Sequence, residues 1–495
     1  MTNQARPWHQ SLTVLLLSAA ALPPLGLVLL WIRRGTKVVW KILGTLPILG
    51  FAVAHLFLFF GLRVEMDGSV SKPMFSFGTR ASHDAQLEAS RAVPPPATVQ
   101  AAPEPPAPAA PPYWTDFRGP NRDGRYDETP ILTAWPKPGL TRLWKQPVGG
   151  GYASFVIAEG RAFTIEQRRN REVVAAYDID TGRELWTNSW AADFREAMGG
   201  DGPRATPTWH EGRLYAQGAE GELRCLEAAT GKLVWSKNIL ADNGAANLTW
   251  GMSASPLVVD EKLIVQPGGP GGKSVVAYHK LTGAPIWKAL DDKQAYTSPM
   301  LVTLGGRRQI VTVTASRAVG LTPEDGTLLW EFPWVTEYDV NASQPIVTGP
   351  NRVFISTGYG HGAAVLELQP AGKAFTVRAV WQNTRMKNKF NPSVLYEGHV
   401  YGLDEGILAC LDAETGQQKW KGGRYGYGQL LLASGHLVVT TETGEVVLVR
   451  ATSERHQELA QFSAIEGKTW NVPALAGGRL FVRNTTEMAC FRITQ

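Results

Sequence analysis

A short motif that ends in tryptophan returns at intervals along most of this chain. In its first clear copy, residues 177–186, an apolar strand runs into Asp-Thr-Gly, and a second short strand ends in Trp186. The glycine can adopt the positive φ of a tight hairpin turn. A unit of about 40 to 50 residues with four strand-like segments cannot bury its own faces, so its neighbours must cover it. The repeat therefore predicts an all-β fold, a β-propeller of four-stranded antiparallel blades.

The number of blades follows from the outer strands. Leu143–Trp144 resembles an outer strand without a unit before it, whereas the last unit, residues 474–493, lacks such a strand. An unpaired strand edge leaves backbone groups unsatisfied, so we expect the strand around Trp144 to pair with the strand around Cys490. This closure predicts eight blades over residues 113–495. The outer strands between those two ends lie at Trp186, Trp235, Trp287, Trp330, Trp381, Trp420 and near Glu458–Leu459.

Two apolar segments precede the repeats. Residues 12–31 and 42–62 are each about as long as a helix that crosses a bilayer, and residues 33–41 between them carry four basic side chains. Under the positive-inside rule, this loop lies in the cytoplasm and both ends lie outside. We therefore expect a two-helix transmembrane hairpin over residues 1–63, in a bacterial inner membrane, with the propeller on the periplasmic side. A cleaved signal peptide is the alternative, because Ser18–Ala21 resembles a cleavage region.

Between the apolar segments and the repeats, residues 64–112 are rich in alanine and proline. This composition cannot build a core and favours extended polyproline conformation, so we expect a disordered, semi-rigid linker. The formal net charge of the whole chain is only +5, and no run of five basic residues occurs. Nucleic acid is therefore not expected as a partner.

The three cysteines are too few for a disulfide framework. Cys225, Cys410 and Cys490 each precede a Leu or Phe at the same place in their own repeats, and these repeats are not adjacent. We expect three small buried hydrophobic side chains. The repeated tryptophans are expected to pack between blades, and the Asp and Thr before each glycine to shape the turn.

A candidate site lies where the first strand of each blade faces the central channel. Each repeat begins with a segment that can be aligned on a proline or its substitute, and several large polar residues share the first position of these segments. Aromatic walls with two cations would suit an anionic ligand. The alternative is that polar residues gather at any wet channel mouth. The candidate ligand-binding residues are Tyr152, Arg204, Trp250, Tyr296, Asp339, Asn341, Lys389, Tyr427 and Trp470.

Known catalytic and metal-binding patterns are absent from the sequence. It contains no Gly-x-Ser-x-Gly, His-Glu-x-x-His, Cys-x-x-Cys or phosphate-binding loop. The glycine-rich stretch at residues 268–272 lacks a following Lys-Ser/Thr and reads as a turn. We therefore assign no catalytic residue and no metal ligand.

The repeats resemble those of the pyrroloquinoline quinone (PQQ) repeat propellers, whose blades end in Asp-x-x-Thr-Gly-x-x-x-Trp. Residues 178–186 and 412–420 match this pattern best. The resemblance covers residues 113–495 and implies one of two functions. One branch comprises the quinoprotein alcohol dehydrogenases, which bind PQQ with calcium and use an Asp base. The other branch is similar to the non-catalytic periplasmic scaffold BamB.

The departures from both branches guide the functional expectation. Adjacent cysteines and an assignable set of calcium ligands are missing, and so is the lipobox cysteine that anchors BamB. We expect a membrane-anchored, non-catalytic binding or protein-interaction scaffold that needs no cofactor and whose protein partners bind the propeller surface. A PQQ-dependent oxidoreductase is the alternative, and polysaccharide binding is a third. The sequence leaves the partner and the oligomeric state open.

Overall fold

The computed structural model describes residues 8–92 and 113–494, which form two compact units. The smaller unit contains residues 8–65 and 73–83. The larger unit contains residues 66–72 and continues from residue 84 to the end of the described chain.

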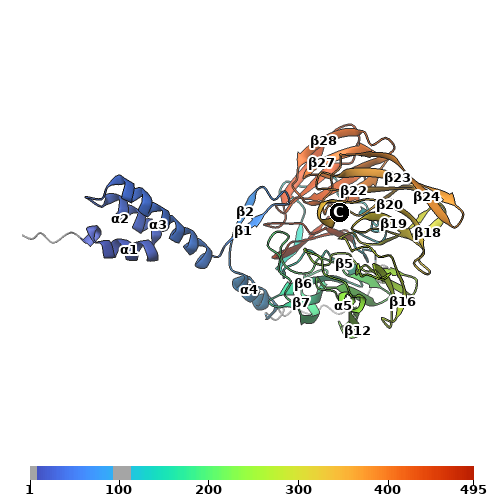
Figure 1. Ribbon diagram of the computed structural model, residues 1–495, viewed down its shortest axis with the longest axis horizontal. Coiled ribbons are helices and arrows are strands. Elements are labelled where there is room, and N and C mark those ends of the chain that lie inside the picture. The colour runs from blue at the N-terminus through green and yellow to red at the C-terminus, as the bar shows by residue number, and fades with distance from the viewer. Residues whose placement is uncertain (1–7, 93–112, 495) are drawn as a thin grey trace, which may run out of the picture. The chain divides into compact units, whose positions relative to one another are not determined.

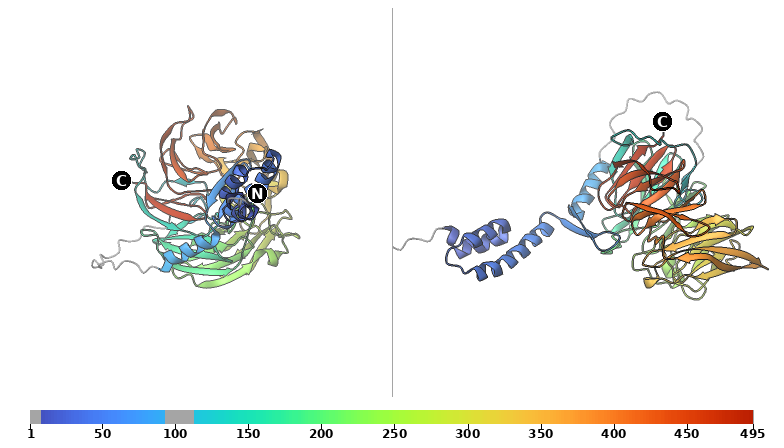
Figure 2. Two further views of the ribbon diagram at one scale, coloured as in Figure 1. Left: turned by 90° about the vertical axis from the view of Figure 1, so that its left-hand side faces the viewer. Right: turned by 90° about the horizontal axis from the view of Figure 1, so that it is seen from above.

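In the larger unit, the described strands form the expected eight antiparallel blades around a central axis (Figures 1 and 2). Seven blades have four strands, and the seventh in chain order gains a fifth, β3 (Arg125–Tyr126), which runs parallel to β29. The eight-bladed prediction is confirmed. The blades are β5 (Val156–Ala158), β6 (Arg161–Arg168), β7 (Arg171–Asp178) and β8 (Glu184–Ala191); β9 (Thr208–His210), β10 (Arg213–Gln217), β11 (Glu222–Glu227) and β12 (Leu233–Asn238); β13 (Leu257–Val259), β14 (Lys262–Val265), β15 (Val275–His279) and β16 (Pro285–Ala289); β17 (Met300–Leu304), β18 (Arg307–Val313), β19 (Arg317–Leu321) and β20 (Leu328–Pro333); β21 (Ile346–Gly349), β22 (Arg352–Thr357), β23 (Gly362–Ala371) and β24 (Ala374–Asn383); β25 (Val394–Tyr396), β26 (His399–Asp404), β27 (Ile407–Asp412) and β28 (Gln418–Arg424); β29 (Gln429–Ala433), β30 (His436–Thr440), β31 (Glu445–Arg450) and β32 (Glu458–Ser463); and β33 (Ala474–Ala476), β34 (Arg479–Arg483), β35 (Glu487–Arg492) and β4 (Arg142–Pro147).

The ring closes through the strand that comes first in the chain. Strand β4 is the outer strand of the last blade and pairs antiparallel with β35, with Trp144 opposite Cys490. Both strands would otherwise present an unpaired edge. The predicted closure is therefore confirmed, and the N-terminal part of the propeller is joined to its C-terminal part by hydrogen bonds.

The repeated tryptophans link most blades to the next. The indole of Trp144 donates to Ile179 O at 2.9 Å, and its ring lies against Gly182 in the hairpin turn of the following blade. Gly182 has a φ of 68°, and a side chain there would collide with the ring. Trp186, Trp235, Trp287, Trp381 and Trp420 donate to the next blade in the same way. Trp330 differs, since it donates to Gln309 within its own blade.

The cysteines behave as expected. Cys225, Cys410 and Cys490 are all free and buried. They lie on β11, β27 and β35, the third strands of three separate blades. Burial raises the pKa of the Cys225 thiol to about 11, so this group stays protonated at neutral pH.

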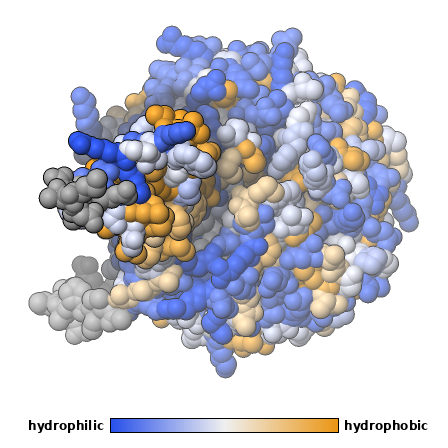
Figure 3. Space-filling view, turned by 60° about the vertical axis from the view of Figure 1, so that its left-hand side comes forward, coloured by the Kyte–Doolittle hydropathy of each residue, from blue (hydrophilic) through white to orange (hydrophobic). Residues whose placement is uncertain are grey.

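The N-terminal region differs from the expected pair of spans. After the short helix η1 (Trp8–Gln10), residues 12–31 form two helices, α1 (Leu12–Ala21) and α2 (Pro23–Ile32), rather than one. At about 1.5 Å per residue, each is about 15 Å long, half of a hydrocarbon core. Helix α3 (Val38–Leu58) alone has the length and composition of a membrane span among the described residues. Apolar side chains of this helical unit lie on its surface (Figure 3).

The predicted linker is partly folded. Strands β1 (Leu62–Met66) and β2 (Pro73–Phe77) pair in a small sheet, and helix α4 (Arg80–Ala92) follows. The prediction of disorder from residue 64 is therefore wrong up to residue 92. The alanine and proline content is concentrated in residues 93–112, which lie outside the described residues.

Candidate functional site

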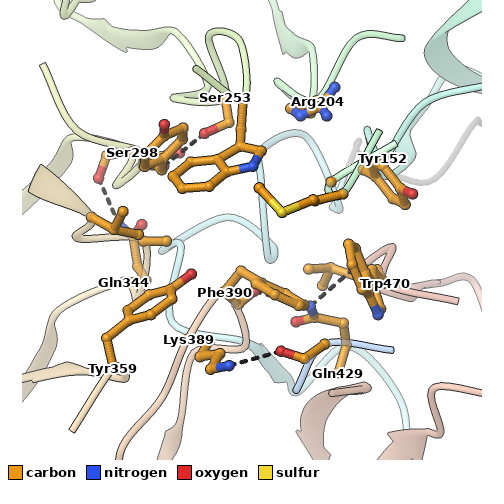
Figure 4. A pocket seen from close by; sticks show the side chains of 18 of the residues that line it. Tyr152, Arg204, Ser253, Ser298, Gln344, Tyr359, Lys389, Phe390, Gln429 and Trp470 are labelled. Carbon is orange, nitrogen blue, oxygen red and sulfur yellow. Dashed lines mark hydrogen bonds between the residues drawn. The ribbon is translucent and has the colours of Figure 1, made fainter. Parts of the chain in front are cut away.

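The inner ends of the blades enclose a cavity of about 230 Å³, called here the central cavity. Its walls come from the segments that lead into the first strand of each blade (Figure 4). These segments lie innermost because the first strand of a propeller blade borders the axis. The eight aligned first positions are Tyr152, Arg204, Ser253, Tyr296, Ala342, Lys389, Tyr427 and Trp470. Seven of them line the cavity, and Tyr427 is the exception.

The floor segment, residues 113–126, passes close to the axis and contributes Phe117 to the cavity. Two arginines fix it there. Arg122 is 2% exposed and donates to Ser255 O at 3.1 Å and Pro299 O at 2.8 Å, while forming an ion pair with Asp116 at 2.6 Å. Arg118 is 1% exposed and donates to Leu430 O in β29 and to Ser393 O just before β25, which belong to two other blades. The floor segment thus joins blades through buried guanidinium groups.

A second segment that borders the cavity comes from the N-terminal region of the sequence. Residues 66–72, called here the 66–72 turn, belong to the propeller unit and connect β1 to β2. Asp67, Gly68 and Val70 line the cavity. The Asp67 carboxylate accepts from Ser69 Oγ at 2.7 Å and from the Ser71 amide at 3.1 Å, which holds the turn in shape.

The walls are largely aromatic. The Tyr152 and Trp470 rings lie 5.4 Å apart, and the Trp250 and Tyr296 rings 5.9 Å apart. Phe390 packs on Trp470 at 4.7 Å. Such walls favour flat or apolar ligand groups. Burial raises the pKa of Tyr296 to about 12, so its hydroxyl remains a hydrogen-bond donor at neutral pH.

Arg204 brings one positive charge to the cavity. Its guanidinium lies 5.4 Å from the Tyr152 ring centroid and 4.9 Å from that of Phe194, and it donates to Gly200 O and Gly202 O. Burial lowers the pKa of Arg204 from its ordinary value. Its backbone contacts orient this charge in the wall.

Lys389 brings the second charge. Its ammonium donates to Gly68 O at 2.7 Å (Figure 4). It also lies 4.6 Å from the Tyr427 ring centroid. Burial lowers the pKa of Lys389. The charge predicted to bind a ligand therefore already holds a backbone carbonyl of the chain itself.

The predicted residues fall into three groups. Tyr427 is displaced from the lining by the 66–72 turn, which covers its ring. Asp339 and Asn341 lie elsewhere, as described below. The remaining six line the central cavity: Tyr152, Arg204, Trp250, Tyr296, Lys389 and Trp470.

Asp339 and Asn341 lie outside the central cavity. Asp339 ends the short helix η2 (Glu337–Asp339), where its φ of 59° turns the chain, and its carboxylate pairs with exposed Lys293 at 3.2 Å. Asn341 is 1% exposed and donates to Thr314 O at 2.9 Å. Sequence proximity to an inner strand is therefore not enough to place a side chain on the axis.

Sequence reasoning missed several lining residues. Phe117 comes from the floor segment, and Gln429 is the first residue of β29. The Gln429 amide nitrogen donates to Phe390 O at 3.0 Å and Trp470 O at 2.9 Å, while its oxygen is buried without a hydrogen-bond partner among the described residues. Gln429 lies two residues beyond the aligned Tyr427, so the alternation of side chains along a strand could have indicated it.

The cavity does not fit a calcium-bound quinone. Calcium takes six to eight oxygen ligands, several of them carboxylates. Among the described lining residues, only Asp67 carries a carboxylate, and it is committed to the 66–72 turn. Within the described chain, no three His, Cys, Asp or Glu side chains are grouped to hold a metal. The lining instead suits aromatic, polar or anionic groups.

Comparisons with known proteins identify the family of the chain. The sequence model of a family described as outer membrane protein assembly factor BamB matches residues 170–422, slightly more than half of the chain. The BamB of Burkholderia pseudomallei is 22% identical over 371 residues, which cover 66% of this chain and 92% of that protein.

Two further proteins similar to this chain represent the dehydrogenase branch and the BamB branch. The quinohemoprotein alcohol dehydrogenase ADH-IIG of Pseudomonas putida is 27% identical over 157 residues, 30% of this chain but only 21% of that enzyme. The crystal structure of BamB from Moraxella catarrhalis superposes with a TM-score of 0.51 at 14% identity, covering 71% of this chain and 97% of that one. The structural similarity supports the fold alone.

Proposed function

We propose a function from the premise that this chain belongs to the family described as outer membrane protein assembly factor BamB. The chain acts as a non-catalytic scaffold: a propeller, tethered to the bacterial inner membrane, that binds a protein partner on the periplasmic side. The long match to BamB, over 92% of that protein, supports a scaffold more than the short match to a dehydrogenase.

The observation that carries this proposal is the chemistry of the central cavity. Oxidation of an alcohol by a quinone needs a base within reach of the substrate and a polarised quinone carbonyl. The described lining offers two cations, four tyrosine or tryptophan rings from the predicted set, and one carboxylate that already accepts several hydrogen bonds. These groups suit recognition of a ligand or peptide.

The tether is proposed on helix α3 (Val38–Leu58), with α1 and α2 beside it as a shorter hairpin rather than a second span. The Gln10 side chain accepts from the Arg34 amide at 2.8 Å and donates to Ile32 O at 3.4 Å. The two ends of the α1–α2 hairpin therefore lie together. Gly26 packs against Ala19, where a larger residue would collide with the neighbouring helix.

Cofactor binding separates the scaffold from the dehydrogenase alternative, which the match to ADH-IIG favours. The purified full-length chain is mixed with PQQ and calcium, and bound cofactor is measured by its absorbance after desalting. We expect no stoichiometric binding and no dye reduction with simple alcohols. Stoichiometric PQQ with alcohol-dependent dye reduction would establish the dehydrogenase instead.

A partner assay tests the scaffold directly. In cells, a photo-crosslinking residue is placed at exposed Leu233 on the outer strand β12, and the same residue at Leu46 in α3 serves as the control. We expect one reproducible protein adduct from the propeller position that the control position does not give. Only background crosslinks across a set of such outer-strand positions would contradict a protein-binding role.

A further inference from the structure

A polypeptide turn occupies the mouth of the central cavity, and the contacts of Gly68 define its site. The Gly68 amide donates to Glu442 Oε1 at 2.7 Å, and the Gly68 carbonyl accepts from Lys389 Nζ at 2.7 Å. A carboxylate and an ammonium therefore hold both backbone polar groups of one residue. Such charge-assisted hydrogen bonds are about twice as strong as neutral ones.

The receptor side of this contact is built from several blades. Glu442 is 7% exposed, and the same Oε1 accepts from Trp470 Nε1 at 2.8 Å. Its other oxygen accepts from the Tyr427 amide at 3.2 Å. Lys389 lies over the Tyr427 ring. The groups that hold Gly68 are thus held in turn by propeller contacts.

The fit at the tip of the turn requires glycine. A Cβ added to Gly68 would lie within 2.6 Å of the Tyr427 Cβ and closer still to the ring. These atoms are near the backbone and cannot move aside easily. Gly68 does not have a positive φ, so the requirement comes from contact with Tyr427 and not from backbone strain.

The 66–72 turn also separates from its sequence neighbours. Residues 66–72 group with the propeller, whereas residues 8–65 and 73–83 on either side group with the smaller unit. A short turn is therefore held by the propeller while the chain that enters and leaves it belongs elsewhere.

We propose that Lys389, Tyr427 and Glu442 form a binding site for a tight, glycine-tipped polypeptide turn, which the 66–72 turn occupies in competition with a loop of a partner protein. The partner loop would carry an Asp-Gly-Ser sequence like that of residues 67–69. The assignment of a protein partner rests on the proposed function. Covalent attachment gives the chain's own turn an effective concentration on the order of millimolar, so a partner must displace it.

Binding of a synthetic turn tests the site. The probe is the head-to-tail cyclised peptide Met-Asp-Gly-Ser-Val-Ser-Lys, labelled with a fluorophore and titrated with the full-length chain in detergent. In Gly68→Ala the chain's own turn no longer seats, so we expect at least tenfold tighter peptide binding than in the unaltered chain. The matched control is Gly349→Ala, whose added Cβ meets no atom closer than 3.7 Å, and it should bind like the unaltered chain.

Further variants separate occupancy from folding. Lys389→Met in the Gly68→Ala background should lose at least tenfold in peptide affinity. In the otherwise unaltered chain, Lys389→Met should speed hydrogen exchange of residues 66–72 without lowering the melting temperature of the propeller. A peptide with alanine in place of its glycine should not bind.

Three results would overturn the proposal. The first is equal peptide affinity in Gly68→Ala and the unaltered chain, and the second is no peptide binding to a Gly68→Ala chain that melts at the same temperature as Gly349→Ala. The third is unchanged hydrogen exchange of residues 66–72 in Lys389→Met. A dimer that Gly68→Ala abolishes would mean that the site takes the turn of a second copy and no partner loop. The peptide-binding assay contains neither PQQ nor alcohol, so its result does not depend on whether the chain is a dehydrogenase. Its failure is therefore distinguishable from failure of the proposed function.

Discussion

Single buried charges hold the propeller together at its axis. Arg122 reaches the entry segments of several blades from one guanidinium group, and Asp116 balances its charge. Burying such a pair costs desolvation, and the cost is offset only when the remaining hydrogen-bonding groups are satisfied. The five donor groups of arginine can meet that condition at a point where several strands converge.

Removing this guanidinium should destabilise the whole propeller. We expect Arg122→Ala to lower the free energy of unfolding by about 3 to 5 kcal/mol, because it leaves the Asp116 carboxylate and several carbonyls without their partner. Arg125→Ala is the control, since Arg125 pairs with exposed Asp127 at 3.4 Å and should cost less than about 1 kcal/mol. Denaturant unfolding of the two variants measures the difference, and equal stabilities would contradict the role of Arg122.

Glu172 should make stability depend on pH. This fully buried carboxyl accepts from the Ala219 amide at 2.8 Å, and burial raises its pKa to about 7 from its usual 4.5. A raised acid pKa means that the folded state favours the protonated form, so the stability present below pH 4.5 is lost as the pH rises toward 7. The loss is about 3 kcal/mol at most.

Replacing this carboxyl with an amide should remove that loss. We expect Glu172→Gln to be more stable than the unaltered chain at pH 8 and nearly equal to it at pH 5, as measured by unfolding at both values. Glu159→Gln, on an exposed turn, is the control and should show no such dependence. If the stability difference between Glu172→Gln and the unaltered chain is the same at pH 5 and pH 8, Glu172 titrates at its ordinary pKa.

At the scale of elements, strand β4 decides whether the ring is closed. It pairs with β35 on one side, and its Trp144 indole donates to the first blade on the other. The same residue therefore belongs to the contact between the last blade and the first. Closure removes the exposed edges that an open sheet would present.

Shortening this side chain should weaken the closure. We expect Trp144→Ala to cost about 3 to 5 kcal/mol, the usual range for a buried tryptophan, and to lower the unfolding midpoint of the entire propeller in one transition. Arg142→Ala, an exposed position on the same strand, is the control. Should Trp144→Ala unfold at the same midpoint as Arg142→Ala, β4 would not be the element that closes the ring.

For the whole molecule, the folded-back α1–α2 hairpin alters the expected topology. A single crossing by α3 places the N-terminal end on the same side as the basic loop, whereas two crossings would place it opposite. The four basic residues at 33–41 favour the cytoplasm for that side. The proposed location of the propeller outside the cytoplasm is the same for both topologies.

Reporter fusions distinguish the two topologies. We expect alkaline phosphatase fused after Pro112 to be active, and a green fluorescent protein fused before Met1 to fluoresce, because this reporter folds in the cytoplasm. A dark N-terminal reporter with an active phosphatase would restore the two-span hairpin. An inactive phosphatase would place the propeller in the cytoplasm and contradict the proposed location.

The architecture can be predicted from the repeats, because the signals for it are local and recur along the chain. Each Asp/Thr-Gly turn and its tryptophan specify one hairpin, and their spacing counts the blades. The same regularity indicated closure of the ring. An outer strand without its own unit precedes the first repeat, and the last repeat lacks an outer strand. The ring of first positions also indicated part of the cavity lining, since seven of its eight residues, including Tyr152 and Trp470, line the cavity.

The tertiary structure decided what no local pattern encodes. Arg122 donates to the Ser255 carbonyl and Gly68 donates to Glu442, and in both contacts the two residues lie more than a hundred positions apart in the sequence. Asp339 was assigned to the axis by its position, but its backbone turns to place the carboxylate beside Lys293. The apolar run at 12–31 has the length of one span, yet the first helix ends at its C-cap Leu22, directly before Pro23, and α2 then packs on α1. The contacts of Arg122 and Gly68 depend on distant parts of the chain, which composition and spacing do not determine.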